Sequence, residues 1–492
     1  SVALGEVTVN REFEQLLDKV RREGGEIRSD SREVGKGDIF VAVPGVNADG
    51  ARFIPPAVEA GASTIVCLPG GAEAEAARAA GCTVVHHDDP REALWRLAEA
   101  RWHTGSLPLR VLGVTGTNGK TTSAYLLEHL FTATGHKVGV LGTVSYRWPG
   151  HCEAAPLTTP DPLRVHAMLA AMAQAGVDIA VMEVSSHALE QQRVCGVPFA
   201  GASFSNLTQD HLDFHQDMES YFRAKSRLFL ELPRADKVMA INGDDPWGRR
   251  LLELCPRALS FGLQKALPQQ RHLWGELLSA GTDGCHLRMH LDGQQWELRS
   301  PLVGAFNASN LLSVQALALE LGLMPDDLRH LEDFHGVCGR LERVPNARKL
   351  HVFVDYAHTP DALANVLKAL RGAGFKRIVT VFGCGGNRDR TKRPIMGEAV
   401  ARYSDVAVLT SDNPRFEDPE AILKDVLPGL REAREVVVEV DRHKATAKAV
   451  EMLGPDDALL IAGKGHEDYQ IIQGTKHHYS DQEVVRELLG CA

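Results

Sequence analysis

One segment constrains the fold of this chain more than any other: VLGVTGTNGKTTSAYLLEHLF, at residues 111–131. A short apolar run meets a turn that contains two glycines, and Lys120, Thr121 and Thr122 then begin a helical pattern. A strand, a glycine-rich turn and a helix in this order indicate one unit of a parallel α/β sheet. Backbone N–H groups of such a turn can surround phosphate groups, and the helix N-terminus adds partial positive charge. The segment therefore predicts a phosphate-binding loop.

The loop supplies its own candidate ligands. Lys120 is placed to reach the β- and γ-phosphates, and the hydroxyl of Thr121 to bind Mg²⁺. The alternative is a strand–turn–helix junction that needs glycines only for its geometry. The pattern departs from the strict G-x-x-x-x-G-K-[ST], because position 114 is Val114 rather than glycine. The candidate phosphate contacts are Gly116, Thr117, Asn118, Gly119, Lys120, Thr121 and Thr122.

Apolar runs alternate with helical patterns along the rest of the chain, which is typical of parallel strands covered on both faces. DIFVAVPG, ASTIVCLPG and CTVVHH form a first group, and KVGVLG, VDIAVMEV, FAGASFSNL and DKVMAING a second. The pattern restarts with HVFVDY, RIVTVFG, DVAVLTSD, REVVVEV and DALLIAG. Between the last two groups, Asp292-Gly293 predicts a hairpin turn. We expect three α/β domains at 1–89, 90–338 and 339–492, the central one P-loop ATPase-like and the last Rossmann-like.

Composition narrows the function. The 492 residues are 44% hydrophobic and 24% charged, as in ordinary globular proteins. A net charge of −10 gives a nucleic-acid partner no electrostatic support. Nine scattered cysteines without a C-x-x-C pair indicate a reducing compartment. The first residues lack the pattern of a signal peptide, and no apolar run approaches the ~18 residues of a membrane span. We expect a cytoplasmic protein without a membrane or nucleic-acid partner.

Several polar residues lie where predicted strands and helices begin or end. Glu183 ends the strand VDIAVMEV, at the edge where α/β sheets bind ligands. Its carboxylate and the hydroxyl of Thr121 suit Mg²⁺, which prefers oxygen ligands. His211 is expected in a loop and Lys225 in a helix. By position alone, such a histidine is more often structural and such a lysine more often solvated.

Further candidates follow in the second half of the chain. Asn307 and Asn310 are one helical turn apart and can share a face, although asparagine at a helix start is commonly a cap. A tetrad, Asp412-Asn413-Pro414-Arg415, ends the strand DVAVLTSD. One interpretation is a turn, which these residue types favour. The other is that Arg415 binds a substrate carboxylate.

Taken together, these motifs resemble the Mur ligase family, the ATP-dependent amide ligases that build the peptidoglycan stem peptide. The motifs are T-G-T-N-G-K-T-T, MEVSSH, SNLTQDHLD, GAFNASN, DYAHTPD and DNPR, and they span essentially the whole chain. The loop is also similar to that of folylpolyglutamate synthetase. The resemblance implies cleavage of ATP, activation of a carboxylate as an acyl phosphate, and attack by an amine.

The resemblance also implies roles for the central residues. Glu183 and His211 would bind Mg²⁺, and Lys225 would carry a CO₂-derived carbamate that helps to hold a second Mg²⁺. Lys120, Lys225 and His211 would act in catalysis. Asn307, Arg340 and Asp355 would contact ATP beside the loop, and His358 lies in the same family segment as Asp355. Arg340, Asp355 and His358 belong to the C-terminal domain and would reach ATP only when the domains approach each other. We therefore expect a hinge near residue 339.

Among Mur ligases, the D-N-P-R tetrad is characteristic of members that add meso-diaminopimelate to UDP-N-acetylmuramoyl-L-alanyl-D-glutamate. Diaminopimelate has a distal carboxylate that lysine lacks, and a guanidinium can pair with it bidentately. The diaminopimelate candidates are Arg388, Asp412, Asn413, Pro414, Arg415, Gly463 and Glu467. The candidates for the UDP-linked dipeptide are Ser29, Ser31, Val46, Asn47, Ala48, Thr158, Thr159, Ser185, Gln191 and Arg193. Leu157 stands where some members have asparagine, so one hydrogen bond to this donor is expected to be missing.

Three alternatives stay open. A lysine-adding Mur ligase would leave Arg415 without a carboxylate to bind. A folylpolyglutamate-type synthetase would leave the first domain and the tetrad unexplained. A P-loop switch or motor protein would share Lys120 and Thr121 but would hydrolyse ATP without an amino acid. The expected partners are therefore ATP, the UDP-linked dipeptide and meso-diaminopimelate, bound by a monomer.

Overall fold

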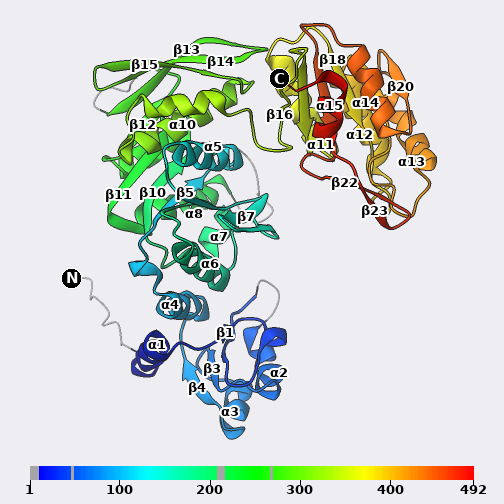
Figure 1. The fold of residues 1–492 in the computed structure, drawn as a ribbon. Helices are drawn as coiled ribbons and strands as arrows, with labels where there is room; N and C mark the ends of the chain where they lie inside the picture. The colour runs from blue at the N-terminus through cyan, green and yellow to red at the C-terminus, as the bar shows by residue number, and fades with distance from the viewer. Residues whose placement is uncertain (1–9, 46–48, 208–216, 266–269, 492) are drawn as a thin grey trace. The chain divides into compact units, whose positions relative to one another are not determined.

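The computed structural model describes residues 10–45, 49–207, 217–265 and 270–491. The chain divides into two compact units. Figure 1 labels the helices and strands of both. The first comprises Ser1–Phe261, Leu267–His272 and Ser313–Met324. The second comprises Gly262–Ala266, Leu273–Leu312 and Pro325–Ala492.

The first unit begins with a small parallel sheet in the order β1-β2-β3-β4. Successive side chains of a strand point to opposite faces. Phe40 and Ile65 therefore pack against helices α2 and α3, while Val41 and Val66 pack against α1 and α4. The elements are α1 (Arg11–Glu23), β1 (Ile27–Arg28), η1 (Ser31–Glu33), β2 (Ile39–Val41), η2 (Gly50–Phe53), α2 (Ile54–Glu59), β3 (Thr64–Cys67), α3 (Ala72–Ala79), β4 (Thr83–His86) and α4 (Pro90–Trp102).

A larger sheet follows in the first unit, with the order β12-β11-β10-β5-β9-β6-β7-β8. β5 lies between β9 and β10 and is parallel to both, so the carboxyl ends of these strands meet at one edge. The elements are η3 (Thr104–Ser106), β5 (Arg110–Thr115), α5 (Lys120–Ala133), β6 (Val138–Leu141), β7 (Ser145–Trp148), β8 (His151–Ala154), α6 (Pro162–Gln174), β9 (Ile179–Glu183), α7 (Ser186–Glu190), β10 (Phe199–Phe204), α8 (Met218–Leu230), β11 (Pro233–Asn242), α9 (Pro246–Leu254) and β12 (Leu259–Gly262).

The predicted hairpin is confirmed in the segment that follows. β14 and β15 are antiparallel, with Leu291 opposite Gln294. The two turn residues, Asp292 and Gly293, have φ of 49° and 81°, as a two-residue turn of this type requires. The elements of this segment are β13 (His272–Gly281), β14 (Gly284–Leu291), β15 (Gln294–Ser300), α10 (Ala305–Glu320) and η4 (Asp327–Asp333).

The C-terminal sheet has the order β16-β17-β21-β18-β19-β20 and is parallel except for β16. Separate apolar clusters cover its two faces. The elements are β16 (Glu342–Arg343), β17 (His351–Asp355), α11 (Pro360–Gly372), β18 (Ile378–Phe382), α12 (Lys392–Tyr403), β19 (Val406–Leu409), α13 (Pro419–Val426), η5 (Leu427–Leu430), β20 (Val436–Val438), α14 (Arg442–Glu451), β21 (Ala458–Ala462), β22 (Tyr469–Ile472), β23 (Thr475–His478) and α15 (Asp481–Leu489).

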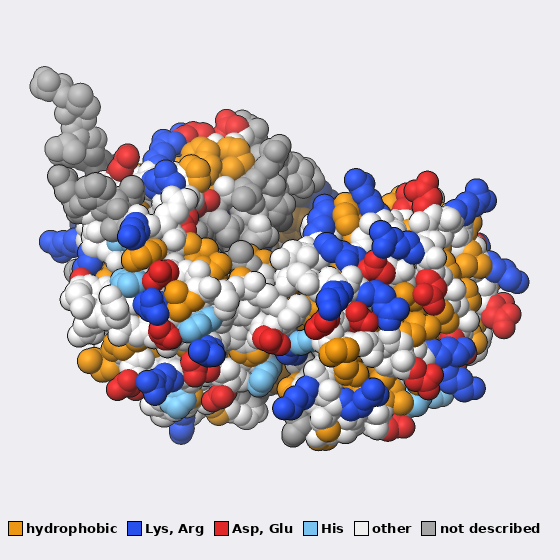
Figure 2. Space-filling model, turned by 90° about the horizontal axis from the view of Figure 1, so that it is seen from above, with side chains coloured by type: hydrophobic (Ala, Val, Ile, Leu, Met, Phe, Trp, Pro, Cys, Tyr) orange, Lys and Arg blue, Asp and Glu red, His pale blue; other side chains and the backbone are white. Residues whose placement is uncertain are grey.

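The predicted α/β fold class is confirmed by these three sheets with their covering helices. The domain boundaries at residues 89 and 338 stay predictions. No helix within the described residues is long and apolar enough to cross a membrane. Figure 2 shows acidic and basic side chains interspersed over the face that it presents.

Candidate active site

The predicted phosphate loop lies between β5 and α5. Gly116 and Gly119 have φ of 148° and 89°, which side chains rarely allow. A Cβ at position 116 would also lie 1.9 Å from Oγ of Ser205. The segment after β10 holds the loop: the backbone N–H of Asn118 donates to Oδ1 of Asn206 (2.9 Å), and Ser205 Oγ donates to the Asn118 carbonyl (2.6 Å). The glycines therefore let a second segment pack directly against the loop.

Two lysines converge on one carbonyl of this loop. Lys120 Nζ donates to the carbonyl oxygen of Gly116 at 2.8 Å and to that of Thr117 at 3.0 Å. Lys225, from α8, donates to the same Gly116 oxygen at 2.9 Å and is 1% exposed. Its ammonium also lies 4.8 Å from the centre of the Tyr221 ring. The structure thus brings two predicted catalytic lysines to the loop.

Glu183 is buried beside the start of α5. Its Oε2 accepts a hydrogen bond from the hydroxyl of Thr121 at 2.9 Å. Thr143 donates twice to the same carboxylate, from its hydroxyl (2.8 Å) and from its backbone N–H (3.0 Å). Carboxylate and hydroxyl oxygens form a donor set that suits Mg²⁺. Sequence reasoning missed Thr143, and the only signal was its position just after the strand KVGVLG.

No cluster of three His, Cys, Asp or Glu residues that could hold a metal occurs within the described ranges. His211, the third predicted metal ligand, lies outside those ranges. Of the other predicted metal ligands, Thr121 and Glu183 contact each other, and Lys225, predicted to bind metal through a carbamate, contacts the Gly116 carbonyl.

Four of the residues predicted to bind the UDP-linked dipeptide form one hydrogen-bond network beside Glu183. Thr159 Oγ1 donates to the Glu183 carbonyl (2.7 Å) and accepts from the backbone N–H of Ser185 (3.1 Å). Arg193 donates to the Thr159 carbonyl at 3.0 Å. The same guanidinium donates to Oε1 of Gln191 at 2.7 Å. The network lies at the carboxyl end of β9, next to the phosphate loop.

The other residues predicted to bind the UDP-linked dipeptide do not belong to this network. Thr158 lies close to this network, with its hydroxyl 3.2 Å from that of Thr143. Ser29 and Ser31 follow β1 in the N-terminal sheet, and Ser31 begins η1. Val46, Asn47 and Ala48 lie outside the residues that the structure describes.

The remaining nucleotide candidates lie in the second unit. Asn307 and Asn310 share a face of α10, as predicted, and Asn310 Nδ2 donates to Asn307 Oδ1 at 3.1 Å. Asn307 also donates to the carbonyl of Val303 at 2.8 Å. Asp355 ends β17 and accepts from the backbone N–H groups of residues 341 (2.6 Å) and 357 (2.7 Å). Burial raises the pKa of the Asp355 carboxyl. Arg340 is exposed.

A cavity of about 440 Å³ lies at the carboxyl edge of the C-terminal sheet. Residues that follow β17, β18, β19 and β21 all contribute to it, as is usual for ligand sites of α/β sheets. It brings together six of the seven predicted diaminopimelate candidates; Pro414 precedes Arg415 but does not line the cavity. The lining residues are Tyr356, His358, Thr359, Gly383, Cys384, Gly385, Arg388, Asp389, Lys392, Arg393, Met396, Asp412, Asn413, Arg415, Gly463 and Glu467.

Arg415 has an unusual backbone. Its φ is 54°, a left-handed conformation that costs free energy for a residue other than glycine. Its backbone N–H donates to the carbonyl of Ile471 in β22 (3.0 Å), and its Nη1 donates to the carbonyl of Gly386 (2.8 Å). The chain turns one step later than the turn interpretation expected, at residues 414–417, where the backbone N–H of Glu417 donates to the Pro414 carbonyl (3.0 Å). Arg415 itself forms a β-bridge with Ile472, and its side chain lines the cavity.

Charges of both signs line the cavity. Arg393 is buried and already paired with Glu417 (2.9 Å) and Asp425 (2.8 Å). Burial raises the pKa of the Cys384 thiol to about 12, so this side chain contributes an apolar surface. Sequence reasoning missed Cys384, Lys392 and Met396, although they lie within or just after the segment GCGGNRDRTKRP. The cavity suits a small zwitterion with an aliphatic middle.

A glycine-rich loop between a strand and a helix in one sheet, and a cavity lined by charges of both signs in another, are features of an α/β P-loop protein. Models of three parts of one family match the chain: "Mur ligase family, catalytic domain" at residues 25–102, "Mur ligase middle domain" at 114–318, and "Mur ligase, glutamate ligase domain" at 339–465. The chain belongs to the Mur ligase family.

Individual relatives cover nearly the whole chain. A UDP-N-acetylmuramoyl-L-alanyl-D-glutamate--2,6-diaminopimelate ligase of Lawsonia intracellularis is 56% identical, over 94% of this chain and 95% of its own. The ligase of the same name from Thermosynechococcus vestitus is 44% identical, over 94% and 92%. A solved structure of a protein with this name is 32% identical, covers 94% of both chains and has a TM-score of 0.70.

Proposed function

We propose that this chain is an ATP-dependent ligase that joins meso-diaminopimelate to the D-glutamate of UDP-N-acetylmuramoyl-L-alanyl-D-glutamate. The observation that carries the proposal is the cavity of the C-terminal sheet, where Arg388 and Arg415 face the same space as Asp412 and Glu467. The distal end of diaminopimelate has one carboxylate and one ammonium, which match these two pairs. Lysine would leave a guanidinium without its anion, which disfavours it. The two relatives and the solved structure support the same substrates through their names.

The reaction follows from this pair of sites. The γ-phosphoryl group of ATP passes to a carboxylate oxygen of D-glutamate, which gives an acyl phosphate and ADP. The neutral amine of diaminopimelate then attacks the carbonyl carbon, inorganic phosphate leaves, and the nitrogen loses a proton. Lys120 is placed to stabilise negative charge on the transferring phosphoryl group, because its ammonium lies at the loop.

The proposed reaction also needs Mg²⁺ and a carbamate on Lys225. Mg²⁺ would be held by Thr121 and Glu183, whose oxygens are 2.9 Å apart, with His211 as the further expected ligand. When bound, it would neutralise phosphate charge. Lys225 would carry a carbamate, formed when its neutral amine bonds to the carbon of CO₂ and loses a proton. Lys225 is buried at the phosphate loop, where such an oxygen ligand would lie close to the nucleotide phosphates. A crystal structure of the active enzyme with unmodified Lys225 would refute the proposed carbamate.

The phosphate loop belongs to the first unit and the amino-acid cavity to the second. Bond formation between an acyl phosphate and an amine requires the two reacting groups to meet. We therefore keep the hinge near residue 339 as a proposal, together with closure of Arg340 and Asp355 on the nucleotide. X-ray scattering should show compaction when an ATP analogue and both substrates bind, and an unchanged radius of gyration would contradict it.

One assay tests the proposed activity. ADP release is measured with the UDP-linked dipeptide present and either meso-diaminopimelate or L-lysine as acceptor. We expect ADP release with diaminopimelate and at least a hundredfold lower kcat/KM with lysine. Equal use of both amino acids would identify a lysine-tolerant ligase, and ADP release without any acceptor would identify a hydrolase. Arg415→Ala should lower kcat/KM for diaminopimelate by about a hundredfold or more while the KM for ATP stays within twofold, since a buried charge pair is lost.

A further inference from the structure

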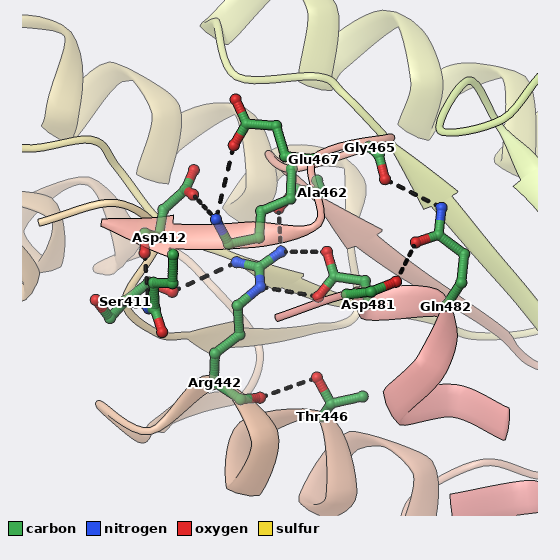
Figure 3. Close-up of polar contacts among 12 residues, drawn as sticks. Ser411, Asp412, Arg442, Thr446, Ala462, Gly465, Glu467, Asp481 and Gln482 are labelled. Carbon is green, nitrogen blue, oxygen red and sulfur yellow. Dashed lines mark hydrogen bonds and ion pairs between the residues drawn. The ribbon is translucent and has the colours of Figure 1, made fainter. Parts of the chain in front are cut away.

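Behind the amino-acid cavity, one ammonium group joins three of its lining side chains. Lys464 follows β21 directly after Gly463, and its side chain is 0% exposed. Its Nζ donates to Oδ1 of Asn413 at 3.1 Å and lies 3.2 Å from Oδ1 of Asp412 and 3.7 Å from Oε2 of Glu467. Figure 3 labels the two carboxylate partners, Asp412 and Glu467, and draws a dashed line from each. Lys464 itself does not line the cavity.

The contacts of Lys464 orient the neighbouring amide. Asn413 Oδ1 accepts from Lys464 and from the backbone N–H of Ile471 (2.9 Å). Its Nδ2 therefore points the other way and donates to Oε2 of Glu467 at 2.9 Å. The backbone carbonyl of Tyr469 accepts a further hydrogen bond from Lys464, at 2.7 Å. The ammonium of Lys464 and the backbone N–H of Ile471 together orient Asn413 toward Glu467.

The charges in this cluster do not cancel. Two carboxylates, Asp412 and Glu467, share one ammonium, which leaves one net negative charge at the wall of the cavity. Without Lys464, two like charges would lie close together at low solvent exposure, and their repulsion would turn one carboxylate away. One net negative charge is what a single ammonium group of a ligand requires.

A second buried pair holds the backbone beneath this cluster. Arg442 and Asp481 are both 0% exposed and 2.8 Å apart. The guanidinium also donates to the carbonyl oxygens of Ala462 (3.0 Å) and Ser411 (3.5 Å), as Figure 3 shows. Burial opposes the charge of Arg442, but the carboxylate of Asp481 outweighs this effect and raises its pKa. The strand ends before Asp412 and Gly463 are thus fixed without Lys464, whose remaining task is to orient side chains.

We propose that Lys464 is a positioning residue for the acceptor amino acid. It holds Asp412, Asn413 and Glu467 in the arrangement that receives the distal ammonium of the acceptor and sets the charge there to one net negative unit. This inference rests on the proposed function, and it adds a residue that does not touch the ligand.

The test compares two acceptors in ADP release by the full-length protein. In Lys464→Met, the KM for meso-diaminopimelate should rise at least tenfold, while the KM values for ATP and the UDP-linked dipeptide stay within twofold. For 2-aminopimelate, which keeps the distal carboxylate but lacks the distal ammonium, KM should be the same in variant and wild type within twofold. A merely structural role would raise the KM of both acceptors equally, and this outcome would overturn the proposal, as would an unchanged KM for diaminopimelate.

Control variants distinguish a specific role of Lys464 from the general effect of losing an ion pair and from failure of the proposed function. Arg371→Met removes a different ion pair of the same sheet, with Asp405 (2.7 Å) at the start of β19, and should leave both KM values unchanged. If Lys464→Met does not fold, Lys464→Gln, which keeps a hydrogen-bond donor without the charge, undergoes the same comparison. Wild type that fails to use diaminopimelate would refute the proposed function. Wild type that uses it while both Lys464 variants keep their KM values would refute only this inference.

Discussion

The phosphate loop and the amino-acid cavity both lie at the carboxyl ends of parallel strands, but they are built differently. The loop is one continuous segment, 116–122, that offers backbone groups and one lysine. The cavity collects side chains that follow four strands and are separated by more than 100 positions, from Tyr356 to Glu467. A site made of consecutive residues depends on local conformation, whereas a dispersed site depends on the strand order. Changes in the two regions should therefore affect nucleotide and amino acid independently.

The largest difference between the effects on the two sites is expected from Lys120→Ala. Removing the ammonium at the loop should lower kcat by about a thousandfold, because it stabilises charge that develops on the phosphoryl group. Binding of meso-diaminopimelate, measured by calorimetry, should stay within twofold. Lys19→Ala, an exposed lysine of α1, is the control. A kcat that falls less than tenfold would mean that the loop is not the phosphate site.

Two glycine substitutions test whether nucleotide binding and amino-acid binding are independent of each other. A Cβ on Gly116 would lie 1.9 Å from Oγ of Ser205, and one on Gly386 would lie 1.9 Å from the carbonyl oxygen of Pro414. Gly116→Ala should weaken binding of an ATP analogue by about a hundredfold and leave the amino acid unaffected, since it displaces the loop. Gly386→Ala should do the reverse. Gly372→Ala, where a Cβ meets nothing within 4 Å, is the control. Loss of both affinities in either variant would contradict the comparison.

The same difference explains what sequence could predict. The loop, the α/β class and the Asp292-Gly293 turn are encoded locally and could be predicted. The seven diaminopimelate candidates came from a family resemblance, because no spacing along the chain brings Arg388 beside Glu467. Lys464 escaped because its burial depends on contacts with residues distant along the chain, Asn413 after β19 and Tyr469 in β22.

Thr143 shows a second limit. It follows β6 in an ordinary G-T-V stretch, and it reaches Glu183 because β6 pairs in parallel with β9, with Leu141 opposite Met182. This register places the two strand ends together. Periodicity alone predicts that both segments are strands but not that they are neighbours.

Both units also bury polar groups. The second unit buries a charged pair, Arg442 and Asp481, whereas the first buries a neutral imidazole, His166, which contacts the Thr104 hydroxyl (2.7 Å) and the Cys195 carbonyl (3.1 Å). Burial lowers the pKa of His166 to about 4. Since the unfolded chain binds this proton at about pH 6.5, the stability it contributes is present above that pH and is lost as the pH falls toward 4.

Acid should therefore destabilise the first unit through the proton that His166 binds in the unfolded chain. Between pH 7 and pH 5 the loss from His166 is about 2 kcal/mol. Scanning calorimetry should show a lower transition temperature for the first unit at pH 5, and His166→Gln should reduce that shift. An equal shift in wild type and variant would mean that the imidazole is not the group that titrates.

The smallest effect is expected from Thr143→Val. The variant loses the hydroxyl bond to Glu183 (2.8 Å) but keeps the backbone bond (3.0 Å), so the carboxylate is held less firmly. Groups that orient a metal ligand typically contribute about tenfold to metal affinity. Calorimetric titration of Mg²⁺ into the complex with an ATP analogue should show a weakening of about this size, and Thr132→Val, on the exposed side of α5, should show none. Because the amino-acid cavity lies in the other unit, the affinity for diaminopimelate should not change; a change there would show that the two sites are coupled even without the donor substrate.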